Sequence, residues 1–283
     1  MQKKINTICF GYQGLGNIGD DLMHLAVLSE IESAYVRQGQ KIRMCDFEEP
    51  NFSYIYKLFT LDKLVFTGGN IFSIESKKSY LKLLFFLTVV AFRRTLDKST
   101  QAISVGINLK VNWLAKKIIL KIIKSLDYIH IRERQSLEFC KEHIDKDIVL
   151  KPDIVLTHDY KLNNIITSKY KTPYSIYFPS LPARYELRRS NNELNLNAPK
   201  FKNHKIISIC QTFGDEKYSR SLAIENMEII RYDIKKLELI LESIQGADEI
   251  VTERYHGAVL AIKYNIEYHT PIKSEKLSKV YIN

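Results

Sequence analysis

The sequence predicts an α/β protein made of two Rossmann-like domains facing a cleft. Three observations support this fold class. Apolar stretches of strand length alternate with stretches of helical periodicity, glycines follow several of the predicted strands, and one polar segment interrupts the alternation. At 283 residues the chain can hold two domains of ordinary size. We expect the first at residues 1–160 and the second at residues 173–283, with the polar segment as a linker.

The first half of the chain reads as repeated strand–helix units. Its predicted strands are short and mostly apolar, and its predicted helices carry apolar residues every three or four positions. Repeated units of this kind favour a parallel sheet with helices on both faces. We place strands at 5–12, 41–47, 63–67, 100–106 and 128–132, and helices at 20–38, 80–94, 112–126 and 135–142.

The second half repeats the alternation after the linker. Strands are predicted at 174–179, 205–211, 227–232, 249–252 and 268–272, with one helix at 234–245 and another over 258–263. This half is therefore also α/β. Because strand ends of both domains should converge on the cleft, we expect the ligand there.

The charge of the chain favours acidic partners. The formal net charge is +10 and the isoelectric point is near 9.2, which suits nucleic acid, a phosphorylated ligand or an anionic membrane surface. No RNA-binding aromatic pattern and no zinc-finger spacing occurs in the sequence, so we expect no nucleic acid partner. The four cysteines lie far apart without a CxxC pair, which argues against a zinc site or a disulfide framework. We expect reduced thiols and no metal.

The start of the chain and its most apolar stretch bear on localisation. The first residues lead into a predicted strand and not into a signal-type apolar region, so we expect a cytoplasmic protein. The stretch 81–92 is too short to span a bilayer, which needs about 20 residues of helix. Basic residues flank it, so it reads as a core helix with snorkelling ends, with a membrane-surface helix as the alternative. These residues are Lys77, Lys78, Lys82, Arg93 and Arg94.

A charged motif follows the predicted strand at 249–252. Arg254 and His256 lie two residues apart, Gly257 follows them, and Glu253 precedes them. A fixed guanidinium beside a titratable imidazole suits a small anion that must also gain or lose a proton. The alternative is a structural ion pair of Arg254 and a helix-start role for His256.

The loop at 11–21 contains a formal GxGxxG pattern, with glycines at 14, 16 and 19. It lies between a strand and a helix, and Asp46 after the next strand could bind a ribose, which favours a nucleotide-binding domain. However, Asp20 and Asp21 at the helix start would oppose a pyrophosphate there. Glycines in a tight turn with an aspartate cap explain the loop without any ligand.

Two further motifs follow strands of the first half. Thr67-Gly68-Gly69-Asn70 lets backbone approach a ligand closely, although a tight turn explains it nearly as well. In Arg132-Glu133-Arg134-Gln135-Ser136, Arg132 could take an anion while Glu133 orients it or caps the next helix. The alternative for this motif is a surface helix start with local ion pairs.

Taken in chain order, these motifs resemble those of the polysaccharide pyruvyl transferases. That family has an early GNxGD loop, a Gly-Gly turn, a GxGI-like strand end, an arginine–acid–xxS element, an aspartate-bearing turn and a terminal RxHG. The matching segments here are Gly16–Asp20, Gly68–Asn70, Val105–Ile107, Ile131–Ser136, Pro152-Asp153 and Arg254–Gly257. Asn70 stands where the family commonly has a third glycine, and Glu133 where it has aspartate.

The resemblance implies a GT-B-like enzyme without cofactor or metal. Phosphoenolpyruvate would be the co-substrate and donor, and the acceptor would be a sugar of a surface polysaccharide, such as a capsule or exopolysaccharide, or of its lipid-linked precursor. The product would be a pyruvate ketal. On the basis of this resemblance we assign catalysis to His256, Arg254 and Arg132. Asp20 and Glu253 are acid/base or acceptor candidates. Donor binding would further involve Gly16, Asn17, Gly19, Gly69, Asn70, Gly257 and Lys276.

Other functions remain open at the level of sequence. One alternative is a glycosyltransferase that uses a nucleotide sugar, or an NAD-dependent Rossmann enzyme that uses the glycine loop. Another is a noncatalytic basic module that binds an anionic glycan or membrane through the lysine-rich helix at 112–126. The basic charge also allows peripheral contact with the inner membrane face, where lipid-linked oligosaccharide acceptors reside.

Overall fold

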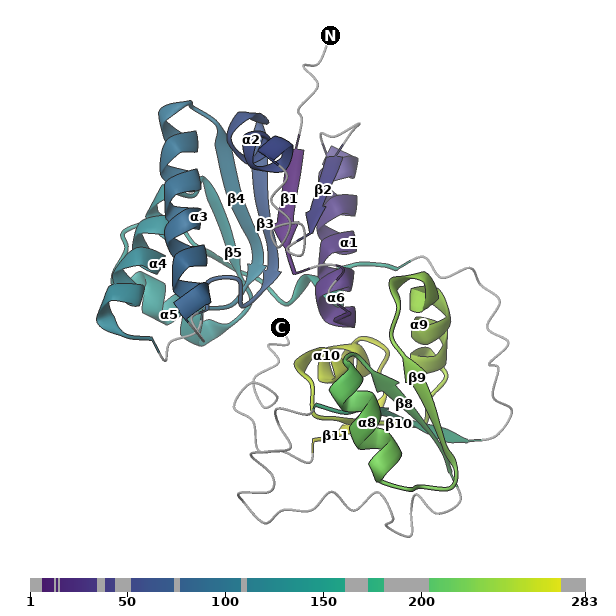
Figure 1. Cartoon of the computed structure of the whole chain (residues 1–283). Helices are drawn as coiled ribbons and strands as arrows, with labels where there is room; N and C mark the ends of the chain where they lie inside the picture. The colour runs from purple at the N-terminus through teal and green to yellow at the C-terminus, as the bar shows by residue number, and fades with distance from the viewer. Residues whose placement is uncertain are drawn as a thin grey trace. The chain divides into compact units, whose positions relative to one another are not determined.

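The computed structural model consists of two compact α/β units (Figure 1). It describes residues 7–12, 14, 16–34, 39–43, 52–73, 77–107, 111–160, 173–180 and 204–270. The first unit contains the described residues up to Ile154 except Gly16–Gly19. The second contains Gly16–Gly19 and the described residues from Val155 onward. Each unit has its own parallel sheet, so the predicted α/β architecture is confirmed.

The sheet of the first unit has six strands in the order β2-β1-β3-β4-β5-β6, and all neighbours are parallel. The strands are β1 (Thr7–Gly11), β2 (Gly39–Arg43), β3 (Lys63–Gly69), β4 (Ser99–Val105), β5 (Tyr128–Ile131) and β6 (Val149–Leu150). The helices are α1 (Ile18–Ala34), α2 (Phe52–Thr60), α3 (Lys77–Thr95), α4 (Trp113–Ser125) and α5 (Arg134–Lys141). A short helix, α6 (Ile154–Thr157), begins where the first unit ends.

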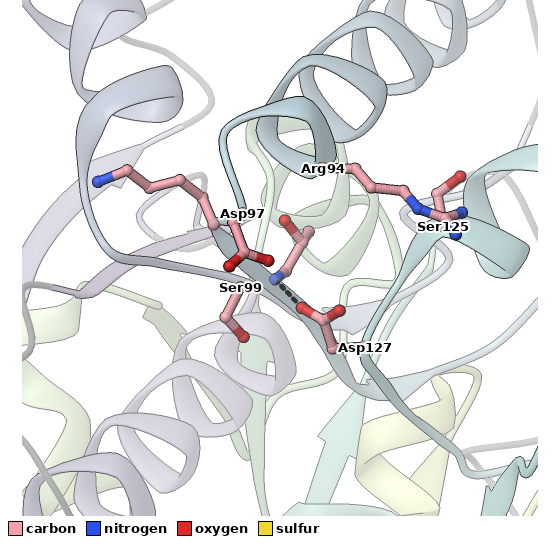
Figure 2. Close-up of a pocket in the computed structure, with 7 residues that line it drawn as sticks. Arg94, Asp97, Ser99, Ser125 and Asp127 are labelled. Carbon is pink, nitrogen blue, oxygen red and sulfur yellow. Dashed lines mark hydrogen bonds between the residues drawn. The ribbon is translucent and has the colours of Figure 1, made fainter.

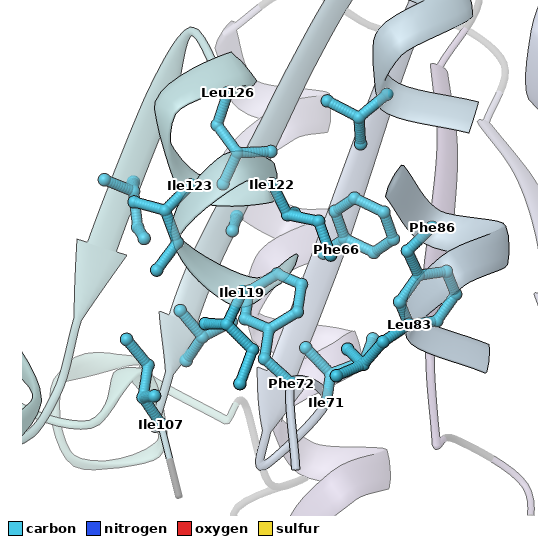
Figure 3. Packing of buried hydrophobic residues seen from close by; sticks show 14 of the residues in the cluster. Phe66, Ile71, Phe72, Leu83, Phe86, Ile107, Ile119, Ile122, Ile123 and Leu126 are labelled. Atoms are coloured by element: carbon cyan, nitrogen blue, oxygen red, sulfur yellow. The ribbon is translucent and has the colours of Figure 1, made fainter. Parts of the chain in front are cut away.

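The core of the first unit lies between its sheet and helices α3 and α4 (Figure 3). Phe66 of β3 and Phe86 of α3 pack with ring centroids 5.1 Å apart, and Phe10 of β1 meets Phe86 edge to face. Helix α4 starts because the Asn112 side chain accepts a hydrogen bond from the amide of Ala115. Its buried residues recur at helical spacing and complete this core: Ala115, Ile118, Ile119, Ile122 and Ile123.

Arg93 at the end of α3 is fully buried in the first unit and corrects the prediction of snorkelling ends. Its guanidinium donates to four carbonyl oxygens and to the hydroxyl of Thr100, and so joins the end of α3 to the segment that leads into β3 and to the start of β4. Burial lowers the pKa of Arg93 to about 10. The carbonyl groups belong to Leu58, Leu61, Asp62 and Ser99.

The sheet of the second unit has five strands in the order β11-β10-β7-β8-β9, all parallel. The strands are β7 (Tyr174–Phe178), β8 (Lys205–Cys210), β9 (Met227–Arg231), β10 (Glu249–Thr252) and β11 (Glu267–His269). Helices α8 (Phe213–Ser221), α9 (Leu237–Gln245) and α10 (Tyr255–Lys263) connect them, with a 3₁₀ turn η3 (Ile234–Lys236) before α9. The central strands β7 and β8 are almost wholly buried, as the continuous apolar runs predict.

Both strand orders contain a point where the winding of the chain reverses. In the first sheet this point lies between β1 and β3, and in the second it lies between β7 and β10. In parallel α/β sheets, ligands bind at the carboxyl ends of the strands that flank such a point. The Gly68-Gly69 turn ends β3, and Arg254 follows β10. The motifs predicted from sequence therefore lie where each sheet is expected to bind ligand.

Several predicted elements differ from the structure. Helices α2 and α8 were not predicted, and α10 begins at Tyr255, so His256 and Gly257 lie inside the helix and not before it. The helix predicted at 234–245 is a 3₁₀ turn followed by α9. In the strand predicted at 41–47, residues beyond 43 lie outside the described structure. Among the described helices, none has the length and apolarity needed to cross a bilayer.

Candidate active site

Arg254 is held in place by two contacts within the second unit. Its Nε donates to the carbonyl oxygen of Pro179 at 2.7 Å, and one Nη donates to a carboxylate oxygen of Asp215 at 2.5 Å. Pro179 follows β7 and Asp215 lies in the first turn of α8, so these contacts cross the reversal point of the sheet. The Asp215 side chain is fully buried, whereas that of Arg254 is 19% exposed. The guanidinium is thus fixed, and part of the Arg254 side chain stays exposed.

Helix α10 begins directly after this arginine. Arg254 is the residue that caps the helix, but its side chain makes no capping hydrogen bond to the first-turn amides. The Thr252 hydroxyl instead binds the backbone N–H of Arg254 itself. A helix start of this kind presents amides and the positive end of the helix dipole, which favour a negative group.

Gly257 explains how α10 can lie so close to the sheet. A Cβ atom at this position would fall 2.1 Å from the Thr252 hydroxyl oxygen and 2.9 Å from the Phe178 ring. Any larger residue would push the helix start, and with it His256, away from β7 and β10. The glycine of the RxHG motif is therefore a packing requirement.

His256 is buried in the first turn of α10 against Gly19. A Cβ atom on Gly19 would lie 1.8 Å from Nδ1 of the imidazole, so the ring rests on the glycine backbone. The Asn17 side chain accepts a hydrogen bond from the amide of Gly19 at 3.1 Å and fixes the turn. At Gly16, with φ of +80°, an added Cβ would approach the carbonyl oxygen of Gln211 to 3.0 Å. The GNxGD loop and the RxHG motif thus meet in the second unit.

Glu253 has both carboxylate oxygens occupied. One accepts a hydrogen bond from the hydroxyl of Tyr177 at 2.8 Å, and the other accepts from the amide of Ser180 at 2.8 Å. The residue is buried and ties the end of β10 to β7. This geometry assigns Glu253 a structural task, and its acid/base role stays a prediction.

In the first unit, the Gly68-Gly69 turn packs against α1. Both glycines have positive φ, +55° and +65°, which a residue with a Cβ rarely adopts. A Cβ on Gly68 would collide with the Met23 side chain, and one on Gly69 would lie 3.2 Å from a carboxylate oxygen of Asp20. The turn therefore places Asp20 beside the end of β3.

Three other predicted residues meet at the same edge of this sheet. A Cβ on Gly106 would lie 2.8 Å from a carboxylate oxygen of Glu133 and 2.9 Å from the side-chain oxygen of Asn70. The Ser136 hydroxyl accepts a hydrogen bond from the amide of Ile107 at 3.0 Å, which joins the start of α5 to the end of β4. The motifs that follow β3, β4 and β5 form one polar group of residues in the first unit.

Arg132 is buried and already has acidic neighbours. Its Nη1 donates to Asp153 at 2.7 Å, and its Nε lies 3.6 Å from Glu133. Asp153 is itself buried, so this ion pair holds the end of β5 against the turn that follows β6. Arg132 is therefore less accessible to an anion than Arg254. The acidic contacts give Arg132 a structural role, and its contact with a donor stays a prediction.

In the part of the chain that the structure describes, neither metal ligands nor a hollow near β4 and β5 gives a second candidate site. Among the described residues, no group of three or more histidine, cysteine or acidic residues could hold a metal ion. A hollow of about 280 Å³ in the first unit is lined by residues such as Arg94, Asp97 and Asp127 (Figure 2). It lies at the amino ends of β4 and β5, away from the carboxyl ends where ligands of parallel sheets bind. Lys276 and Asp46 fall outside the described residues.

The family model for polysaccharide pyruvyl transferase matches residues 17–267. The chain belongs to this family. The match covers site residues of both units: Arg132, Asp153, Asp215, Arg254 and His256. A comparison with curated proteins gave no match.

Solved structures show that this member of the family has a GT-B-like fold. Similar structures include UDP-GlcNAc 2-epimerase of Methanocaldococcus jannaschii with UDP-GlcNAc and UDP, at a TM-score of 0.56 and 12% identity over 94% of this chain and 83% of that chain. Staphylococcus aureus MnaA with UDP has a TM-score of 0.59 and 8% identity, over 94% of this chain and 79% of that chain. The UDP-GlcNAc 2-epimerase of Neisseria meningitidis bound to UDP-GlcNAc has a TM-score of 0.52 and 8% identity, over 96% of this chain and 89% of that chain. At these identities the likeness concerns the fold alone.

From its position after a predicted strand, Asp215 could face the cleft, although the sequence favours a solvated loop residue there. The structure instead buries it at the start of α8. Thr212 and Asp215 form a reciprocal capping box at the start of α8, in which each side chain binds the other's backbone amide. The pattern Thr-x-x-Asp before a helix is a known start signal and could have revealed both α8 and this residue. Its second partner, Arg254, lies 39 positions away and could not be read from local sequence.

Proposed function

We propose that the protein transfers pyruvate from phosphoenolpyruvate to a sugar of a surface polysaccharide or of its lipid-linked precursor, forming a pyruvate ketal. Membership of the family supports a polysaccharide transferase. The choice of donor rests on one observation: Arg254 is fixed by two contacts and lies two residues before His256 at the start of α10. Phosphoenolpyruvate has a carboxylate and a phosphate, which match a guanidinium and helix-start amides.

Arg254 is suited to bind one anionic group of the donor. A guanidinium has five N–H groups in a planar fork, and the two contacts to Pro179 and Asp215 leave others for a ligand. Because the fork is already oriented, little side-chain entropy is lost when the anion binds. Lysine would give a charge at this position but not the geometry.

His256 is suited to the proton transfers of the reaction. Ketal formation requires addition of a proton to the methylene carbon, attack of one sugar hydroxyl on C2 with loss of the hydroxyl proton, and departure of phosphate. A second hydroxyl then closes the ring and releases its proton, so the products are the ketal and inorganic phosphate. We assign His256 to the donor phosphate, where imidazole can protonate the leaving group or stabilise its charge.

Other predicted residues have supporting roles in this proposal. Arg132 is our candidate in the first unit for contact with an anionic group of the donor. Asp20, beside the end of β3, is our candidate for the base that accepts the hydroxyl proton, and Glu253 is the alternative. Gly69, Asn70 and Lys276 remain donor-binding candidates. No further cofactor is part of the proposal.

We further propose that the first unit docks on anionic lipid through α3 and α4. These helices pack side by side on one face of the sheet, and their 32 residues include no acidic residue. On α4, Trp113 is 67% exposed and precedes the exposed Lys117, Lys121 and Lys124 at helical spacing. Helix α3 also has exposed apolar residues: Leu81, Leu84 and Phe92. An aromatic and apolar surface with lysines suits a negatively charged bilayer.

Turnover with a panel of acceptors tests the transferase. Purified protein is incubated with phosphoenolpyruvate and sugars, and we expect phosphate release together with a mass gain of about 70 Da on the acceptor, the mass of pyruvate minus water. Arg254→Ala and His256→Ala should abolish both signals, and the surface variant Arg220→Ala should retain them. Phosphate release that is equal in all four proteins would contradict the proposal, as would transfer from a UDP-sugar without phosphoenolpyruvate.

Co-sedimentation with vesicles tests the lipid surface. We expect binding to phosphatidylcholine vesicles that contain phosphatidylglycerol, loss of binding at high salt, and no binding to phosphatidylcholine alone. Lys117→Glu with Lys121→Glu should weaken binding by at least about 30-fold. Lys235→Glu with Lys236→Glu, on exposed positions of the second unit, is the matched control. Equal effects of the two pairs would mean that net charge, and not this surface, determines binding.

A further inference from the structure

Gln211 is a buried polar residue whose side chain has no partner in the described structure. It directly follows β8 and is 4% exposed, and neither Oε1 nor Nε2 of its amide makes a hydrogen bond there. Buried amides are nearly always paired, because an unpaired donor or acceptor loses its water without compensation. A native protein that keeps such a group needs a reason, and a missing ligand is one.

The position of Gln211 links it to the proposed donor residues. Its carbonyl oxygen contacts Gly16, and the His256 ring contacts Gly19 of the same short segment. Three residues of chain span at most about 10 Å, so Gln211 and His256 flank one small region of the second unit. The next residue, Thr212, begins the capping box that includes Asp215, the partner of Arg254.

The chemistry of the amide indicates what kind of group it binds. Phosphoenolpyruvate, with its ionised carboxylate and phosphate, offers acceptors that could pair with Nε2 but nothing that donates to Oε1. A hydroxyl group both donates and accepts, so two neighbouring hydroxyls of a sugar satisfy both atoms of the amide. We infer that Gln211 binds hydroxyl groups of the acceptor sugar. This inference rests on the proposed function and assigns a specificity-determining residue to it.

Binding measurements on the full chain test this inference without turnover. The ligands are methyl glycosides of galactose, glucose, mannose and N-acetylmannosamine, followed by calorimetry or saturation-transfer NMR. Gln211→Met, which keeps the length of the side chain, should bind the best glycoside about tenfold more weakly. Its affinity for phosphoenolpyruvate should be unchanged. Gln245→Met, at an exposed position at the end of α9, is the matched control.

Thermal stability separates a ligand-binding role from a structural one. Because Gln211→Met removes an unpaired buried amide, its melting temperature should equal or exceed that of the wild type. Gln211→Glu, which keeps an acceptor but loses the donor, should also weaken glycoside binding. A lower melting temperature of Gln211→Met, or glycoside affinity equal to the wild type, would overturn the inference.

The two proposals can fail separately. If the wild type binds phosphoenolpyruvate but no glycoside, the assignment of Gln211 is wrong and the donor proposal stands. If it binds a glycoside through Gln211 but not phosphoenolpyruvate, the pyruvyl transfer proposal is wrong and the assignment of Gln211 stands.

Discussion

The carboxylate of Asp215 lies 2.5 Å from the guanidinium of Arg254 and joins the ends of two strands, β8 and β10, that are separated by β7. The same carboxylate accepts a hydrogen bond from the amide of Thr212 at 2.9 Å in the capping box of α8. One fully buried acid therefore starts a helix and orients the arginine that we assign to the donor.

Replacing Asp215 should affect folding and donor binding together. Asp215→Asn removes the charge opposite a partly buried arginine and weakens the cap, so we expect a loss of about 2 kcal/mol or more in the free energy of unfolding. Phosphoenolpyruvate should bind at least about tenfold more weakly, because Arg254 is no longer held. Urea unfolding and calorimetry measure the two effects. Glu216→Gln, on the partly exposed next residue, should change neither, and an equal effect would contradict the assignment.

A methyl group on Gly19 should damage activity more than stability. In Gly19→Ala the added atom would overlap the His256 ring, so the imidazole must move. A displacement of this size should lower kcat about 100-fold. The melting curve should stay close to that of the wild type, because alanine suits the first turn of α1.

Gly246→Ala, after the end of α9, is the control for Gly19→Ala. Gly246 has φ of −92°, a conformation that alanine adopts, and it is exposed. Activity should be unchanged in this variant. Full activity of Gly19→Ala would show that the position of His256 is unimportant for the reaction.

Arg93 should be among the most important residues for stability in the first unit. Arg93→Met leaves four buried or partly buried carbonyl groups without this donor, and we expect a loss of about 3 kcal/mol or more. Arg94→Met, at the exposed neighbouring position, should stay within about 0.5 kcal/mol. Chemical denaturation of both variants checks this, and similar losses would refute the role given to the buried guanidinium.

His130 should make stability depend on pH below neutrality. Burial lowers its pKa from the ordinary value of 6.5, and its Nε2 lies 3.3 Å and 3.2 Å from the carbonyl oxygens of Lys151 and Pro152. In the window between the lowered pKa and 6.5, the unfolded chain takes up a proton that the folded protein does not. Stability is therefore complete above about pH 6.5 and decreases as the pH falls.

Replacing His130 should flatten this pH dependence. The free energy of unfolding of His130→Gln should change less between pH 7.5 and pH 5.5 than that of the wild type, as urea titrations at both values would show. His143→Gln, at an exposed histidine, is the matched control. Equal slopes for all three proteins would mean that His130 does not couple folding to protons.

The parallel sheets and their motifs could be predicted because they depend on local patterns. Strands such as β7 and β8 are continuous apolar runs, and each motif follows a strand at a fixed distance. Helix α2 escaped prediction because its aromatic residues, Phe52, Tyr54, Tyr56 and Phe59, are typical of strands as well. Helix α8 escaped because it is polar and short.

The partners of the charged residues could not be predicted from local sequence. The sequence allowed Arg93 a solvated role beside an apolar helix, and only packing shows that it is buried. Likewise, Arg254 was open to an ion pair or a ligand, and the structure gives it an ion pair while leaving part of the side chain exposed. Burial and long-range pairing decide such cases, and neither is encoded in the spacing of nearby residues.

The hydrogen bonds of Arg93 also bear on the order in which the first unit folds. All its acceptors lie within 35 positions in the chain, so loop closure adds little entropic cost to their assembly. We expect α3, with the segments at 58–62 and 99–100, to belong to the folding nucleus. Arg93→Met should then slow refolding in a stopped-flow experiment, and not only accelerate unfolding.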